Sequence, residues 1–340
     1  MIAIDGTTGE GGGQVLRTAL SLSAITGKPF VLKNIRGKRS TPGLRQQHLT
    51  CVEAAAEICD AVVDGGHIGS SILTFRPGKH IIPGRYSWDI VTAGSTTLVL
   101  QTVLPVLAMA DRTSHVKLTG GTHNPMAPPV DFIQQSFLPL LAGMGFSSAV
   151  HLERYGFYPR GGGIIEARIK EKTKGRALSL IKRSRMTRAR AVVLSSGLPA
   201  HIARREKNVL MASRLFADQA IEILQPRMGQ TGNVVWAIVE DGPLRCVFTS
   251  FGQKGKAAEV VAQEVIEQIL LHDITGLPVE AHLADQILLY MALRRDGCFA
   301  TSSLSLHATT NMAIIGKFLE VTFEIEDLDG GRLVRIRPMQ

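Results

Sequence analysis

The first stretch of the sequence that could do chemistry is residues 9–14, GEGGGQ, which lead into the apolar run VLRTALSLSAIT. Glycines ahead of a helix let backbone N–H groups approach an anion such as phosphate. The carboxylate of Glu10 would repel a bare phosphate unless a divalent cation lies between them and takes oxygen ligands from both. The same six residues also fit a tight turn with a solvated acid, because short glycine motifs occur often without function.

Other polar side chains stand early in segments that are expected to be helical. Arg17 follows the glycines, and Gln47 and His48 lie one turn into LRQQHLTCVEAAAEIC. Gln101 lies inside TTLVLQTVLPVLAM, where an amide needs a hydrogen-bond partner to be tolerated. Taken alone, Gln101 also fits a hydrogen-bonded amide in the core, and His48 fits a structural histidine as well as a site residue.

Two more candidates lie near the end of the chain. Asp285 begins an expected helix, where the helix dipole alone would favour an acid. His307 precedes the apolar helix in SLHATTNMAII and, taken alone, fits a structural histidine. The sequence has no GxxxxGK[ST], GxSxG or HExxH motif, and its four cysteines lack CxxC spacing. These absences argue against a P-loop nucleotide site, a zinc hydrolase and structural disulfides.

The elements that must position these residues repeat along the chain. The order helix, strand, helix, strand, strand is expected over residues 14–75, again over 94–169, and again over 282–337. A strand is expected before each first helix, although the third of these is weak. The sequence therefore predicts an α/β fold with three copies of a β-α-β-α-β-β unit.

A segment with a different order separates the second and third copies. Residues 183–276 give one strand, a helix, two strands and a second helix. We expect a small inserted α/β domain over 183–276 and a discontinuous repeat domain over 1–182 and 277–340. A length of 340 residues is itself typical of about two domains.

Composition and charge limit the location and the partners that can be expected for the protein. The chain is 45% hydrophobic, but no run approaches the ~18 apolar residues that a membrane helix needs. The N-terminus lacks the pattern of a signal peptide, so a cytoplasmic protein without membrane contact is expected. Residues 168–190 hold ten Lys or Arg and one acid, a net +9 that equals the charge of the whole chain. This stretch fits a site for a polyanion such as nucleic acid, or else a solvated linker.

Six blocks of sequence, taken together and in order, closely resemble the RNA 3'-terminal phosphate cyclase family. The blocks are GEGGGQVLRTALSLSAITGKPF, IRGKRSTPGLRQQHLT, GGTHNPMAPPVDFI, GFYPRGGG, HLADQ and HATTN. The resemblance covers essentially the whole chain. It implies three β-α-β-α-β-β repeats like those of the enolpyruvyl transferases, with a thioredoxin-like α/β insert, which is the layout that the element order predicts.

The resemblance also implies a reaction. A cyclase of this kind uses ATP and a divalent metal, Mg²⁺ or Mn²⁺, to form a histidine–AMP adduct and passes the AMP to an RNA 3'-phosphate. The neighbouring 2'-OH then attacks that phosphorus, which releases AMP and leaves a 2',3'-cyclic phosphate. The implied partners are therefore ATP and RNA with a 3'-phosphate end. Whether the protein forms a homo-oligomer is left open.

Position by position, the resemblance assigns roles to named residues. The nucleophile falls on His307, the metal ligand on Glu10, and Asp285 is an acid that orients the imidazole or balances its developing charge. A larger set is implied at the triphosphate and the RNA end, where the forked guanidinium of arginine suits phosphate. Its members are Arg17, Arg36, Arg39, Gln47 and His48.

The nucleotide site is implied by a further set, Gln101, Pro128, Pro129, His282 and Gln286, together with Asp285 and His307. Pro128 and Pro129 match the region that packs on the adenine. The chain departs from the family at His282, where many relatives place a tyrosine against the other face of the base. This predicts weaker stacking.

Two alternatives share the predicted architecture. One is a non-catalytic relative of the ribosome-assembly type, and the joint presence of His307, Glu10 and Asp285 counts against it. The other is an enolpyruvyl transferase, which acts on a small anionic substrate. The HATTN block and the basic stretch at the start of the insert disfavour it.

Overall fold

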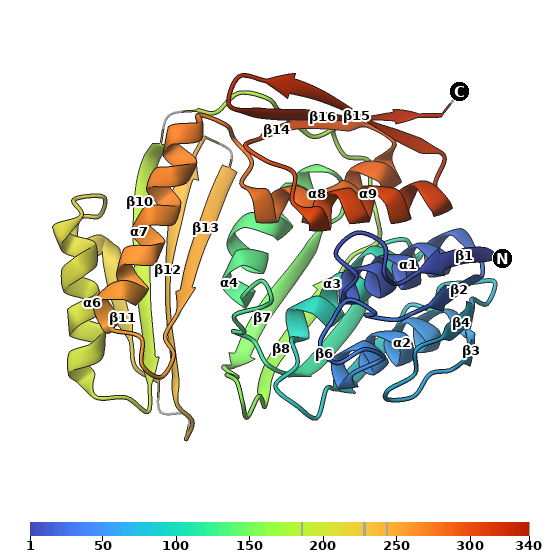
Figure 1. The fold of residues 1–340 in the computed structure, drawn as a ribbon, viewed down its shortest axis with the longest axis horizontal. Coiled ribbons are helices and arrows are strands. Elements are labelled where there is room, and N and C mark those ends of the chain that lie inside the picture. The colour runs from blue at the N-terminus through green and yellow to red at the C-terminus, as the bar shows by residue number, and fades with distance from the viewer. Residues whose placement is uncertain (185, 227–228, 243, 340) are drawn as a thin grey trace.

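The protein is a mixed α/β structure, as the element order predicts. In the computed structural model, which describes all residues except 185, 227–228, 243 and 340, the strands form four four-stranded sheets with helices packed against them (Figure 1). Three of these sheets share one strand order: a parallel pair, followed by two strands that add antiparallel.

The first sheet contains the N-terminus. Its strands, in spatial order, are β1 (Ile2–Asp5), β2 (Phe30–Lys33), β4 (Leu73–Arg76) and β3 (Val62–Asp64). Its two helices are α1 (Gly13–Thr26) and α2 (Gln46–Cys59). The helix expected from residue 44 thus begins two residues later, after an extended Arg45.

The second sheet follows in the chain. Its strands are β5 (Arg85–Asp89), β6 (Ser114–Gly120), β8 (Gly163–Ile169) and β7 (Ser148–Arg154). Its helical segments are α3 (Thr96–Leu107), α4 (Val130–Phe132), a π-helical segment (Ile133–Phe137) and α5 (Leu138–Gly143). A single helix is expected from residue 130. Because Pro139 has no N–H for the carbonyl of Gln135, the regular α-helical bonding is interrupted there.

The third sheet combines a middle segment with the C-terminus. Its strands are β9 (Ser179–Leu180), β14 (Gly297–Thr301), β16 (Gly331–Pro338) and β15 (Val321–Leu328), and its helices are α8 (Ala281–Arg294) and α9 (Leu306–Phe318). The helices α1, α9 and α8 pack side by side, with the β14–β16 sheet over α8 and α9 (Figure 1).

The fourth sheet forms the remaining part of the molecule, drawn in yellow and orange in Figure 1. Its strands are β11 (Ile221–Leu224), β10 (Met186–Ser196), β12 (Gly232–Asp241) and β13 (Leu244–Phe251). It is accompanied by α6 (Ala200–Ala212), a 3₁₀ turn (Asp218–Ala220) and α7 (Ala258–Thr275).

Side chains alternate across this fourth sheet, so it has two different buried faces. Val193 and Val235 join a separate apolar cluster with residues of α6 and α7. Leu194 and Trp236 point the other way and join the main core, which runs through the other three sheets. The fourth sheet therefore has its own core and is also packed firmly against the rest of the protein.

The basic stretch at residues 168–190 is not one continuous cationic surface. Arg183 is buried: its side chain is 7% exposed, pairs with Asp241, and lies 3.1 Å from Asp273. It also donates a hydrogen bond to the His272 carbonyl. Arg185 lies outside the described residues. Arg183 is thus a structural ion-pair partner, and the hypothesis of a polyanion site cannot include it.

This placement predicts a contrast between two neighbouring cations. Arg183→Met leaves Asp241 buried without a partner, so we expect it to lower the free energy of unfolding by about 3–5 kcal/mol. Lys182→Met removes an exposed charge and should change it by less than about 0.5 kcal/mol. Urea unfolding of both variants measures the difference, and equal losses would contradict the structural role of Arg183.

Candidate active site

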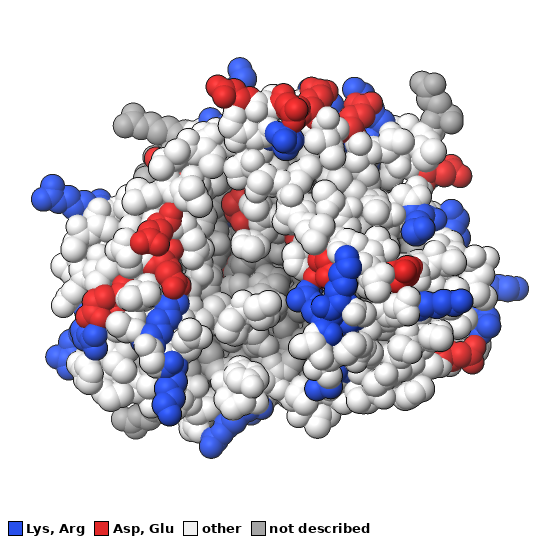
Figure 2. Space-filling view, viewed as in Figure 1, with Lys and Arg blue, Asp and Glu red and all other residues white. Residues whose placement is uncertain are grey.

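The residues that sequence reasoning selected come together around one cavity of about 600 Å³. It lies where the part containing β10–β13 meets the rest of the molecule, and Figure 2 shows the surface hollowed between these two parts. All of the predicted site residues line it: Glu10, Arg17, Arg36, Arg39, Gln47, His48, Gln101, Pro128, Pro129, His282, Asp285, Gln286 and His307.

The glycines that precede α1 make room for side chains. A Cβ atom at Gly12 would lie 2.3 Å from a carboxylate oxygen of Glu10. At Gly13 it would lie 2.3 Å from His48 Nε2 and 2.9 Å from Arg17. The interpretation that these glycines leave space for a phosphate is therefore incomplete, because at both positions protein side chains fill that space.

Glu10 lies at the centre of a charged cluster. Its carboxylate is only 7% exposed, and one oxygen pairs with Arg39. Its other oxygen, Oε1, lies 3.6 Å from His307 Nδ1, beyond normal hydrogen-bond distance. The backbone N–H of Glu10 donates to the hydroxyl of Thr310 in α9, which fixes the glycine turn against that helix.

His307 is the second residue of α9, whose N-terminus is capped by the side chain of Ser305. Its Nδ1 lies 2.7 Å from Gln14 Oε1. Because an amide oxygen can only accept, Nδ1 carries the proton and the lone pair of Nε2 is available. Burial lowers the pKa of His307, and Arg17 and Arg39 lower it further while Glu10 opposes them. The imidazole is therefore held in its neutral, nucleophilic form.

Gln14 is a site residue to which sequence reasoning gave no role. Among the described residues, Nδ1 of His307 donates its hydrogen bond to Gln14, and Asp285 makes none with the imidazole. Gln14 thus makes the contact that orients the ring in this structure, and the role of Asp285, orienting the imidazole or balancing its developing charge, stays a prediction. Its place one residue after the glycines was the only signal, and that position alone does not indicate a partner 293 residues away.

Asp285 lies in α8 with its carboxyl group facing the cavity. Its Oδ1 is buried and makes no hydrogen bond within the described residues. Burial raises the pKa of Asp285 to about 8, with Glu280 and Glu10 raising it and Arg17 lowering it. This carboxyl therefore holds a proton at neutral pH.

The cationic wall of the cavity is partly desolvated. Burial lowers the pKa values of Arg17 and Arg36. It also lowers the pKa of His48 to about 3, helped by four nearby arginines, so His48 is neutral, and its buried Nδ1 has no partner in the described structure. Guanidinium groups that have lost part of their water favour a bound anion, and a buried nitrogen without a partner costs free energy until a ligand pairs with it.

Amides and apolar groups complete the cavity. Gln101 donates a hydrogen bond to Gln286, and Gln47 accepts one from the Ser95 backbone N–H at 2.7 Å. Pro128 is fixed by the hydroxyl of Thr97, which donates to its carbonyl at 2.7 Å. Sequence reasoning missed a further wall, which comes from the fourth sheet and α7 and consists of Val247, Thr249, Phe251 and Gln268.

The donor set fits a divalent cation that arrives with a nucleotide. The described residues contain no group of three or more His, Cys, Asp and Glu side chains that could hold a metal ion by themselves. Mg²⁺ in nucleotide sites is bound by one or two carboxylates and takes its other ligands from phosphates and water. Glu10, buried beside arginines that would hold those phosphates, suits that arrangement.

Comparison with known proteins shows the family of the chain. The family model described as RNA 3'-terminal phosphate cyclase matches residues 8–325. The chain belongs to this family. It is 44% identical over 336 residues to the RNA 3'-terminal phosphate cyclases of Salmonella enteritidis PT4 (strain P125109) and Salmonella gallinarum (strain 287/91 / NCTC 13346). Each match covers 99% of this chain and 98% of the relative.

Membership of the cyclase family confirms the resemblance and the enzyme class predicted from the sequence. The match spans the N-terminal glycines, the fourth sheet and the helix that contains His307. None of the described helices is long and apolar enough to cross a membrane.

The raised pKa of Asp285 predicts a pH-dependent stability difference. The folded protein keeps this proton up to about pH 8, whereas the ordinary pKa is 3.8. Between these values the folded state binds more protons than the unfolded state, so stability is lost as pH rises. The melting temperature of Asp285→Asn, relative to wild type, should therefore increase from about pH 4 to about pH 8 and then level off.

Thermal unfolding across this pH range measures the effect. Asp296→Asn, which removes an exposed carboxylate just beyond the same helix, is the matched control and should show no such trend. A difference between Asp285→Asn and wild type that stays constant with pH would contradict the raised pKa.

Proposed function

We propose that the protein converts an RNA 3'-phosphate end to a 2',3'-cyclic phosphate in an ATP-dependent reaction that passes through a covalent histidine–AMP intermediate. Family membership supports the overall reaction. The observation that carries the mechanism is the hydrogen bond from His307 Nδ1 to Gln14, which leaves Nε2 of a neutral imidazole free at a cavity lined by arginines.

In the first step, the lone pair of His307 Nε2 attacks the α-phosphorus of ATP. A P–N bond forms, the bond from that phosphorus to the bridging β-phosphate oxygen breaks, and pyrophosphate leaves. Gln14 Oε1 accepts the hydrogen bond from Nδ1–H throughout the step and so stabilises the cation that develops on the ring. Glu10, 3.6 Å from Nδ1, adds a negative charge that favours the same cation.

In the second step, an oxygen of the RNA 3'-phosphate attacks the same phosphorus. The P–N bond breaks, and RNA(3')pp(5')A forms while His307 returns to its neutral state. The 2'-OH then attacks the RNA phosphorus, loses its proton, and expels AMP. Covalent catalysis thus divides one difficult displacement into easier ones.

The arginines have the role of phosphate ligands in this proposal. Arg17, Arg36 and Arg39 surround the cavity next to Glu10 and His307, and each can offer paired N–H donors to phosphate oxygens. Neutral His48 lines the cavity beside them and is our candidate for a contact with the RNA end. A bound Mg²⁺ or Mn²⁺ ion, with Glu10 as its protein ligand, would neutralise phosphate charge.

Asp285 keeps a separate role in the proposal. Its carboxyl holds a proton at neutral pH and would lose that proton when cationic charge develops nearby, and the carboxylate would then balance the imidazolium. Pro128, Pro129 and His282 remain our candidates for contact with the adenine, and Gln101 with Gln286 for polar contacts to the nucleotide.

The architecture is included in the same proposal. The three sheets with one strand order would be three copies of a β-α-β-α-β-β unit like those of the enolpyruvyl transferases, over residues 1–182 and 277–340. Residues 183–276 would be a thioredoxin-like insert, which the separate apolar cluster of the fourth sheet supports. The cytoplasmic location stays a prediction.

His307→Asn should abolish protein labelling by α-³²P-ATP with Mn²⁺, because the amide is not a nucleophile. The wild-type label should be acid-labile, as a P–N bond is. His80→Asn, which changes an exposed histidine that does not line the cavity, is the control and should label normally. Acid-labile labelling that persists in His307→Asn would refute the proposed nucleophile.

The role of Gln14 can be separated from a purely structural one. Gln14→Leu removes the acceptor for the Nδ1 proton, so we expect about 5- to 10-fold slower labelling, from the ~1 kcal/mol of one hydrogen bond. Gln14→Glu restores an acceptor, and its charge raises the pKa of His307, so labelling should recover while its acid limb moves to higher pH. If Gln14→Glu fails like Gln14→Leu at every pH, Gln14 does not position the imidazole.

A further inference from the structure

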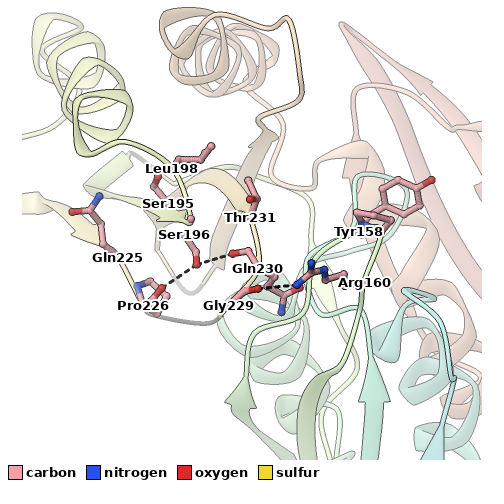
Figure 3. Close-up of a pocket in the computed structure, with 12 residues that line it drawn as sticks. Tyr158, Arg160, Ser195, Ser196, Leu198, Gln225, Pro226, Gly229, Gln230 and Thr231 are labelled. Atoms are coloured by element: carbon pink, nitrogen blue, oxygen red, sulfur yellow. Dashed lines mark hydrogen bonds between the residues drawn. The ribbon is translucent and has the colours of Figure 1, made fainter.

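A second cavity of about 790 Å³ lies outside the candidate active site (Figure 3). One wall is the loop GFYPR, which the sequence comparison selected but the proposed reaction does not use, and it contributes Tyr158 and Arg160. The opposite wall comes from the ends of β10 and β11 and the start of β12, including Ser196 and Thr231. Among the described residues that line it, Arg160 is the one charged side chain, so the lining is cationic.

The two walls are firmly joined. The ring of Phe157 packs directly on Gly232, where a Cβ atom would lie 2.2 Å from the ring. The amide oxygen of Gln230 accepts a hydrogen bond from the Phe157 backbone at 3.4 Å, and Arg160 donates one to the Gly229 carbonyl at 2.9 Å, which Figure 3 shows at the floor of the cavity. These contacts hold the two walls, and therefore the shape of the cavity, in place.

The exposed groups of this cavity suit an anionic ligand that also carries aromatic rings. Tyr158 is 73% exposed, so its ring is available for stacking. Arg160 is exposed and uses one nitrogen for Gly229, which leaves other N–H donors for an anion. Helix α6 begins beside the cavity at Ala200, and its N-cap residue, Pro199, makes no side-chain cap, so the positive end of the helix dipole adds to this field.

The second cavity and the candidate active site lie close together on the paired strands β12 and β13. Thr231 lines the second cavity, and three residues farther along, Val234 of β12 pairs with Phe251, which lines the active-site cavity. At about 3.3 Å per residue this separation is roughly 10 Å. Stacked nucleotides rise about 3.4 Å each, so about three of them would cover the distance.

We propose that this second cavity binds the RNA strand a few nucleotides upstream of its 3'-phosphate end. Arg160 contacts a backbone phosphate, and Tyr158 stacks on a base. The inference rests on the proposed function, because an RNA whose 3' end enters the active site must leave along a neighbouring surface. A phosphorylated peptide would also satisfy the positive charge, but nothing would require it to lie this close to the active site.

The test compares RNA lengths. Fluorescence anisotropy without ATP measures the Kd of an oligouridylate 3'-phosphate of about 12 nucleotides, a length within known single-strand site sizes. A uridine dinucleotide 3'-phosphate is measured by competition. We expect Tyr158→Ala to weaken the long RNA about 10-fold, as loss of one stacked base does, and to leave the dinucleotide unchanged. Arg160→Ala should also reduce the slope of log K against log salt by about 0.7.

Arg85→Ala is the matched control. Arg85 is exposed on β5 and pairs with His115 at one end of β6, whereas Gly163, beside the GFYPR loop, pairs with Gly120 at the other end. It should leave the length dependence unchanged. Equal losses for both RNA lengths, or no loss for either, would overturn the proposal, and the second result would point to a different partner.

Failure of this inference can be distinguished from failure of the proposed function. If wild-type protein cyclises the dinucleotide 3'-phosphate and becomes labelled by ATP, the active-site proposal stands whatever the long RNA does. Because Tyr158 and Arg160 are exposed, both variants should keep the wild-type melting temperature, which thermal unfolding checks.

Discussion

The candidate active site depends on the way Asn311 joins three helices. Its buried side chain accepts a hydrogen bond from Thr18 in α1 at 2.8 Å and donates one to the Asp285 carbonyl in α8, also at 2.8 Å. Asn311 lies one helical turn after His307, and Thr18 lies one turn after Gln14. The buried bond therefore sets the spacing of α1 and α9 that the Gln14–His307 contact requires, and it fixes the backbone of Asp285 beside them.

Electrostatics turn this geometry into a receptor for anions. Burial makes the imidazoles of His48 and His307 harder to protonate, and it raises the pKa of Asp285. The cavity thus holds neutral groups next to guanidinium groups that have lost water. A polyphosphate that enters would restore favourable interactions for the arginines and would in turn make protonation of the imidazoles easier. In the proposed reaction, anion binding and protonation of His307 are coupled in this way, and the hydrogen bond from Nδ1 to Gln14 fixes which ring nitrogen carries the proton.

Sequence reasoning predicted much of this and missed what depends on tertiary contacts. Periodicity was sufficient for the α/β order, and family blocks were sufficient to select residues that line one cavity. Neither could indicate that Gln14 rather than Asp285 holds His307, because such pairing depends on how two helices pack. The role of Arg183 likewise depends on its burial. Its charge suggested a polyanion site, but its position between Asp241 and Asp273 makes it a structural ion-pair partner. Residues of β13 were missed because their alternation predicts a buried strand and does not say which face meets the cavity.

The fourth sheet is part of the site and is not an appendage. Its second face packs into the main core, and Trp236 on that face contacts the ring of His123, which is held by Asp131 at 2.7 Å. His123 is followed by the loop that leads to Pro128 and Pro129, so the apolar wall of the cavity and the fourth sheet are held in register by one buried ring contact. Thr231, which immediately precedes β12, lines the second cavity, and Val247, Thr249 and Phe251 of the neighbouring strand β13 line the active-site cavity. A shift of this sheet would therefore move a wall of each cavity together.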